Sequence, residues 1–152
     1  MFGFFKKKKE EEPEITVDSP DLGKLTWWMG TWYGKCTVLI YGEPTEVDLY
    51  VNTYDDEIDE PISVQEERFR YYREHENELN DKIEKALLDE YKLDNASLVR
   101  SRFKPIHLIL HSNGDCGLAF RDFEKQEGSN VAEVVVAIFP EVKYAGSIEG
   151  YD

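Results

Sequence analysis

The clearest alternation of apolar and polar side chains lies in one short segment before the middle of the chain. Val47, Leu49 and Val51 fall on one side of an extended strand, whereas Glu46 and Asp48 fall on the other. This pattern is typical of a strand with one buried face and one solvent-facing side. We therefore expect the two acidic side chains to be exposed and the three aliphatic ones to be buried.

Further extended segments lie on either side of a helical region. They comprise residues 24–29, 31–41 and 46–53 before the helical region and residues 105–112, 116–122, 131–139 and 142–148 after it. Asn113-Gly114 separates two of these segments. We expect a hairpin with a type I′ turn there, since Asn-Gly tolerates positive φ at both central positions.

A helix is predicted to begin near Ser63, because Ser63 followed by Glu66 forms a capping box. Apolar residues then recur at near-helical spacing. The members of this stripe are Phe69, Tyr72, Leu79, Ile83, Ala86 and Leu87. The predicted fold is an α+β domain, in which an antiparallel β-sheet of about six to seven strands carries one long helix on a face. Residues 1–20 are expected to be a flexible charged tail, and residues 21–152 a single domain.

Charged side chains on the polar side of this helix are spaced for ion pairs four residues apart. Glu66, Arg70 and Glu74 form one series, and Glu78 with Lys82 forms another. The apolar stripe weakens between Glu74 and Glu78, which leaves open a kink or two shorter helices.

Acidic residues are concentrated between Cys36 and Glu67, a segment with ten Asp or Glu and no Lys, Arg or His. The net charge of −14 argues against binding to a nucleic-acid backbone. A field of one sign can instead attract a partner of opposite charge. The sequence therefore predicts an acidic binding surface for a basic protein, made by Glu46, Asp48, Asp55, Asp56, Glu57, Asp59 and Glu60.

Three tryptophans lie close together, at Trp27, Trp28 and Trp32. Trp27 and Trp28 are adjacent, so both cannot face the core from one regular strand. Either one is exposed, or a bulge or a second layer accommodates it. Because exposed tryptophans are frequent at the centre of protein interfaces, all three are candidate interface residues.

No catalytic, metal or cofactor site is predicted. His107 and His111 share one face of a strand, but four residues of strand separate them by about 13 Å, too far to share one ion. Cys116 near His111 has the residue types of a nucleophile and its base, yet it has no surrounding catalytic motif. The acidic run at residues 55–60 lacks the spacing of a calcium loop, and the Gly-rich phosphate-binding patterns are absent.

The first residues place three phenylalanines beside Lys6, Lys7, Lys8 and Lys9. Such a segment could touch an anionic membrane, although the glutamates that follow offset it, so membrane contact is not the expected role. No apolar run approaches the length of about 20 residues that spans a bilayer. With only two cysteines, a reduced cytoplasmic protein is the expectation.

The order of these elements resembles small bacterial domains of unknown function, some of which are similar to immunity proteins of toxin systems. The resemblance rests on Ala86-Leu87-Leu88-Asp89-Glu90-Tyr91, Ile106-His107-Leu108-Ile109-Leu110, Gly114-Asp115-Cys116-Gly117-Leu118-Ala119-Phe120 and Tyr144-Ala145-Gly146-Ser147-Ile148-Glu149-Gly150. It implies a bacterial origin, a fold and a role in protein binding. It assigns no functional residue.

The leading hypothesis is a non-catalytic bacterial module that binds a basic protein through an acidic surface, as an immunity protein binds its toxin. Two alternatives stay open. One is an enzyme of unrecognised class, which a deep pocket containing His107, His111 or Cys116 would favour. The other is a peripheral membrane accessory protein that uses the Phe/Lys N-terminus.

Overall fold

The computed structural model describes residues 14–53, 63–127, 130–137 and 144–147. Two groups of residues singled out above lie outside this part of the chain. They are the Phe/Lys segment at residues 2–9 and the acidic run at residues 55–60.

Within these residues, eight strands form one sheet in which the spatial order follows the sequence. They are β1 (Thr16–Ser19), β2 (Gly23–Trp28), β3 (Thr31–Ile40), β4 (Glu43–Asn52), β5 (Phe103–His111), β6 (Cys116–Glu127), β7 (Asn130–Ala137) and β8 (Tyr144–Ser147). The α+β class is confirmed, but the predicted count of six to seven strands is too low. The additional strand is β1, which pairs with β2 although the sequence placed its residues in the N-terminal tail.

Three helices are described instead of the single long helix expected: α2 (Ser63–Glu74), α3 (Glu76–Glu90) and α4 (Ala96–Arg102). His75, at φ −113° and ψ 19°, separates α2 from α3 where the apolar stripe weakens. Asn95 caps α4, because its side chain accepts a hydrogen bond from the Leu98 N–H.

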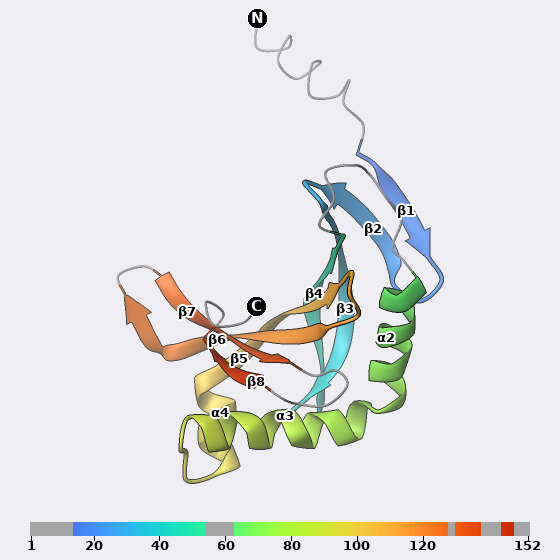
Figure 1. The fold of residues 1–152 in the computed structure, drawn as a ribbon. Helices are drawn as coiled ribbons and strands as arrows, with labels where there is room; N and C mark the ends of the chain where they lie inside the picture. Colours follow the sequence, from blue (N-terminus) through green and yellow to red (C-terminus); the bar gives the residue numbers. More distant parts are fainter. Residues whose placement is uncertain (1–13, 54–62, 128–129, 138–143, 148–152) are drawn as a thin grey trace, which may run out of the picture.

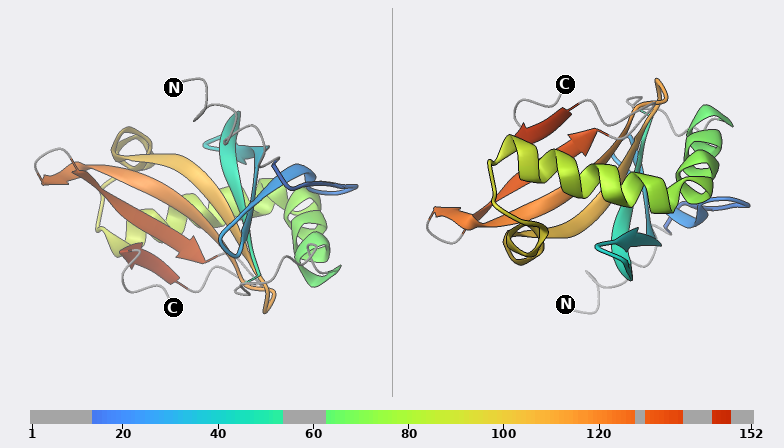
Figure 2. Two further views of the ribbon diagram at one scale, coloured as in Figure 1. Left: turned by 90° about the horizontal axis from the view of Figure 1, so that it is seen from above. Right: turned by 90° about the horizontal axis from the view of Figure 1, so that it is seen from below.

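All neighbouring strands are antiparallel except β4 and β5, which run parallel in the centre of the sheet. Parallel strands require a crossover connection, and the three helices lie in that connection. Figures 1 and 2 show that α2 and α3 cover one face of the bent sheet, with α3 in front of the strands from below and behind them from above. Among the helices described, none is long and apolar enough to cross a membrane.

The core lies between the helices and this covered face. Val47, Leu49 and Val51 are all buried, which confirms the predicted orientation of β4. They pack in one cluster with the buried side chains of the helices, which are Phe69, Tyr72, Leu79, Ile83, Leu87 and Val99. The apolar stripe read from the sequence therefore faces the sheet.

Type I′ geometry occurs in this protein, but not at the predicted position. Met29 and Gly30 (φ 46° and 82°) connect β2 to β3, and Tyr41 and Gly42 (φ 56° and 80°) connect β3 to β4. Between β5 and β6 only Gly114 has positive φ, at 94°, so the type I′ turn predicted at Asn113-Gly114 is wrong. The loop there is longer, closed by the hydrogen bond from the His111 N–H to the Asp115 carbonyl.

Candidate functional site

A basic side chain, Lys35, lies beside the acidic side chains of β4. Glu46 is exposed and Asp48 is partly exposed, both on the face of the sheet opposite the helices. Lys35 of β3 is the cross-strand neighbour of Asp48, and its Nζ lies 3.1 Å from Asp48 Oδ1 and 3.9 Å from Glu46 Oε1. The hydrogen bond and the charge of Asp48 raise the pKa of Lys35, with a smaller contribution from Glu46. The pairing of β3 with β4 thus places a lysine beside the acidic segment between Cys36 and Glu67, which itself contains no basic residue.

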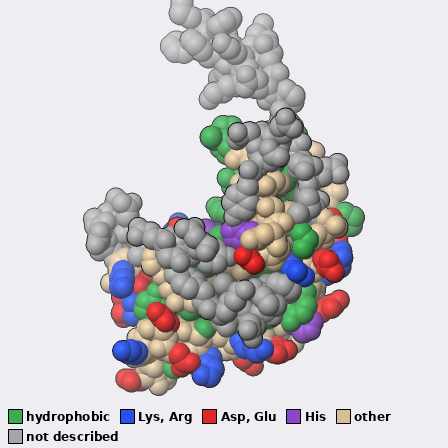
Figure 3. Space-filling model, viewed as in Figure 1, with side chains coloured by type: hydrophobic (Ala, Val, Ile, Leu, Met, Phe, Trp, Pro, Cys, Tyr) green, Lys and Arg blue, Asp and Glu red, His purple; other side chains and the backbone are tan. Residues whose placement is uncertain are grey.

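The remaining predicted acidic residues, Asp55, Asp56, Glu57, Asp59 and Glu60, lie outside the described residues. Over α3 and α4, acidic and basic side chains are interspersed rather than separated (Figure 3). The ion pairs there are Glu78–Lys82, Lys85–Asp89 and Glu84–Arg100. Acidic residues still outnumber basic ones over α3 and α4, by six to four. Of the predicted acidic binding residues, Glu46 and Asp48 are those within the described part of the chain.

The three tryptophans have different environments. Trp32 is buried in the core, and Trp27 is partly buried with its ring 5.1 Å from that of Trp32 in an edge arrangement. Trp28 points to the other side and is 64% exposed. Met29, next to it in the β2–β3 turn, is also exposed. Of the three aromatic interface candidates, Trp28 alone presents a large exposed surface.

An aromatic row that sequence reasoning missed lies on the face opposite the helices, which we call the helix-free face. Strand register places Tyr33 beside Tyr50, with ring centroids 5.0 Å apart. Parallel pairing of β4 with β5 brings His107 next, stacked on Tyr50 at 4.4 Å. The alternation of β4 puts Tyr50 on the same side of the strand as Asp48, but the partner strand depends on a parallel pairing that local patterns do not reveal.

His107 is only 8% exposed, and its burial lowers the pKa of its imidazole, while Glu133 and Asp48 act in the opposite direction. Burial also raises the pKa of Tyr50, with further contributions from Asp48 and other neighbours. Both rings are therefore neutral at pH 7. This arrangement offers aromatic surface and neutral hydrogen-bonding groups with carboxylates nearby.

A nucleophile–base pair does not form at Cys116. Its cross-strand neighbour is Leu110, and its side chain belongs to the core on the helix-covered face. His111 follows Leu110 on β5, so strand alternation turns its side chain to the other face. Burial raises the pKa of the Cys116 thiol to about 12, so it is protonated and inert at pH 7. His111, at the end of β5, is partly buried, and that burial lowers its pKa.

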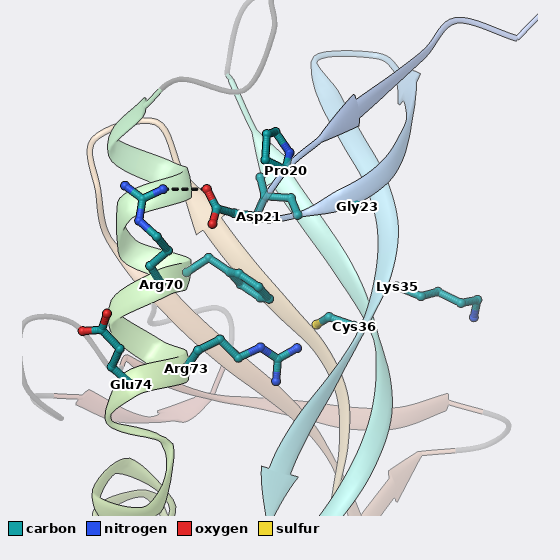
Figure 4. A pocket seen from close by; sticks show the side chains of 10 residues that line it. Pro20, Asp21, Gly23, Lys35, Cys36, Arg70, Arg73 and Glu74 are labelled. Carbon is teal, nitrogen blue, oxygen red and sulfur yellow. Dashed lines mark hydrogen bonds and ion pairs between the residues drawn. The ribbon is translucent and has the colours of Figure 1, made fainter.

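A cavity of about 460 Å³ opens between α2, β3 and the β1–β2 turn. We call it the α2–β3 cavity; it is lined by Pro20, Asp21, Leu22, Gly23, Lys35, Cys36, Phe69, Arg70, Arg73 and Glu74. Figure 4 shows Cys36 and Arg73 directed toward this space and Lys35 directed away from it. The sequence spacing suggested that Arg70 pairs along the helix, but in the structure it forms an ion pair with Asp21. Arg70 and Arg73 are one helical turn apart, which is the only sequence signal for this site.

No group of three or more potential metal ligands occurs among the residues that the structure places. No protein-family model, curated protein or solved structure matches this chain. The helix-free face and the α2–β3 cavity are therefore the two candidate binding sites of this protein.

Proposed function

We propose that this protein is a non-catalytic module that binds a basic protein through its helix-free face, in the manner of an immunity protein that binds a toxin. The observation that carries the proposal is the aromatic surface of this face. Trp27 and Trp32 pair on the core side of β2 and β3, so Trp28 and Tyr33 point to the opposite side. Tyr50 continues this surface on β4.

Tryptophan and tyrosine are enriched among the residues that dominate binding energy at protein interfaces. Trp28 offers a large exposed ring at the end of a hairpin, and hydrophobic side chains gather at that end of the molecule (Figure 3). Tyr33 is more than one-third exposed and packs edge-on against Tyr50. Rings fixed by packing lose little conformational freedom on binding, which favours affinity.

Charge supports a basic partner. Glu46 and Asp48 lie on the same face as the aromatic row, and the whole chain carries a net charge of −14. Complementary charge mainly accelerates association and excludes partners of the same sign. Lys35 reduces the local negative charge, so we assign recognition to the aromatic residues and steering to the carboxylates.

The test compares tagged proteins as baits in extracts of the source cells, followed by kinetics with the captured protein. Wild type should retain a basic protein that Trp28→Ala loses, because truncating a central tryptophan costs 2 kcal/mol or more, or about 30-fold in affinity. Glu46→Gln with Asp48→Asn should slow association and reduce its dependence on salt.

Leu98→Ala is the matched control, because Leu98 is an exposed apolar side chain on α4, away from the helix-free face. It should leave capture and kinetics unchanged. Equal binding by wild type and Trp28→Ala, or loss of binding in Leu98→Ala, would contradict the proposed interface. Melting temperatures of all variants show whether any loss of binding reflects unfolding.

A further inference from the structure

We propose that the α2–β3 cavity binds a small organic carboxylate, with Arg73 holding its anionic group. This site is independent of the helix-free face. Cys36 points into the cavity, whereas the neighbouring Lys35 side chain points away from it, toward Asp48 of the helix-free face (Figure 4). A ligand here and a protein there would therefore contact opposite sides of β3.

The cavity exists because β2 and β3 separate. β3 extends to Ile40, but β2 pairs only with its residues Thr31, Trp32 and Tyr33. At Gly34 the two strands still touch so closely that an added Cβ would be 2.7 Å from Leu25 Cδ2. Beyond this point the β1–β2 turn leads away from β3 and α2 faces the gap. A volume of about 460 Å³ is within the range of ligand pockets.

Apolar groups form the inner wall of the cavity. Leu22 and Phe69 are buried in the core, and Cys36 is partly buried beside them. Burial raises the pKa of the Cys36 thiol to about 11, with Glu76 and Asp48 acting in the same direction and Arg73 opposing them. The thiol is therefore neutral at pH 7 and adds to the apolar wall.

Two guanidinium groups lie at the polar side, but only that of Arg73 is directed into the cavity, whereas Arg70 is directed to Asp21 (Figure 4). Arg70 Nη1 lies 2.5 Å from Asp21 Oδ2 at the rim. Arg73 Nη1 donates to the Thr37 carbonyl and lies 3.4 Å from Glu76 Oε1, and its guanidinium lies 4.8 Å from the centre of the Phe69 ring.

Within the described residues, the hydrogen bonds of both guanidiniums involve Nη1 alone. A guanidinium has five N–H donors in a planar fork, so Arg73 retains donors that suit the two oxygens of a carboxylate.

The acidic neighbours determine which anion fits. Glu74 points away from the cavity, and Asp21 is held by Arg70 (Figure 4). Glu76 stays close to Arg73, and the whole protein is strongly negative. A singly charged carboxylate is repelled less by this surrounding charge than a phosphate dianion. The apolar wall adds a preference for a ligand with a hydrophobic body, such as an N-acylated amino acid.

Cys36 provides a direct measurement. Cys116 is buried, so of the two cysteines Cys36 is the one that a neutral maleimide can reach. N-acetyl-L-leucine at millimolar concentration should slow maleimide modification of Cys36, measured by mass spectrometry, and calorimetry should give a saturable isotherm. N-acetyl-L-leucinamide has the same body without the charge and should do neither. Inorganic phosphate should protect less than N-acetyl-L-leucine.

Arg73→Gln should weaken N-acetyl-L-leucine binding by about tenfold or more, the effect of losing a hydrogen bond to a charged group. Arg100→Gln is the control, because Arg100 pairs with Glu84 outside the cavity and its loss should not change binding.

Failure of the carboxylate to protect Cys36 would overturn the proposal, as would equal protection by the amide or by phosphate. The comparison of the three probes uses the wild-type protein and does not depend on how any variant folds. It also does not involve the helix-free face, so this site can fail while the proposed function stands.

Discussion

Asp122→Ala should be among the most destabilising single substitutions in this protein. Asp122 is fully buried on β6 and receives two hydrogen bonds from Arg102 at the end of α4, at 2.8 and 3.0 Å. The guanidinium of Arg102 also lies 4.8 Å and 5.0 Å from the ring centres of Tyr91 and Phe103. This cluster holds the last helix of the crossover against the sheet.

The size of the stability loss depends on the Arg102 charge, which stays buried after the substitution. The Arg102 side chain is only 11% exposed, and the hydrogen bonds to Asp122 raise its pKa. An arginine guanidinium keeps its positive charge in proteins, so the buried charge persists in the variant. Removing one partner of a buried ion pair costs about 3–5 kcal/mol, because the other charge stays buried without its main counterion. Glu124, the carboxylate that remains beside Arg102, is exposed and compensates little of this cost. Asp122 also accepts from the Glu124 N–H at 3.1 Å, a bond that alanine loses. For a chain of this length we expect the melting temperature to fall on the order of 10 °C.

Urea denaturation and thermal melting measure this effect. Glu124→Gln is the control, because Glu124 lies 3.4 Å from the same guanidinium but is exposed, so its loss should cost about 0–1 kcal/mol. Arg102→Met combined with Asp122→Leu should recover much of the stability, since it removes both buried charges. A stability of Asp122→Ala within about 1 kcal/mol of wild type, or a double variant less stable than Asp122→Ala, would contradict this role of the buried ion pair.

Three further outcomes are expected from titration and denaturation experiments. The pKa of His107 is lowered by burial from its ordinary 6.5, so the unfolded chain binds more protons in that range and stability should fall as the pH drops below about 6.5. Relative to wild type, His107→Gln should flatten this part of the curve, by at most about 1.4 kcal/mol per pH unit. Gln65→Leu should cost about 1–3 kcal/mol in urea denaturation, because the Gln65 amide donates at 3.0 Å to the carbonyls of Asn52 and Leu110, one on each parallel strand. Asn95→Ala should cost about 1 kcal/mol by the same assay through loss of the α4 cap, and an unchanged midpoint would show that α4 does not depend on it.

Local periodicity predicted the elements well. The orientation of β4 and the apolar stripe of α2 and α3 were both correct, because each is set by a repeat of two or 3.6 residues against one buried face. The ion pair of Glu78 with Lys82, at 2.8 Å, follows from the same local geometry. The helix break at His75 was left open by the sequence, since a weakened stripe fits either a kink or two helices.

Pairing between distant segments could not be predicted in the same way. Nothing in β4 or β5 alone indicates that they run parallel, and the stack of Tyr50 on His107 depends on that register. The two type I′ turns were also missed, because Met29 and Tyr41 are unusual at positive φ. Paired strands on both sides of each turn impose that conformation on a residue that does not favour it by itself.

The crossover also explains why the helix-free face is the better place to seek an interface, and which residues should be used to test it. All three described helices belong to one connection, and α2 and α3 cover one face of the sheet. Ile109 and Ala119 on the other face are nevertheless buried, and they lie beside Tyr50 and His107 in the strand register. Truncating either ring would disturb the sheet surface as well as any contact with a partner. Trp28 is 64% exposed and lies at the end of a hairpin, so a loss of binding in Trp28→Ala without a loss of stability would report on recognition alone.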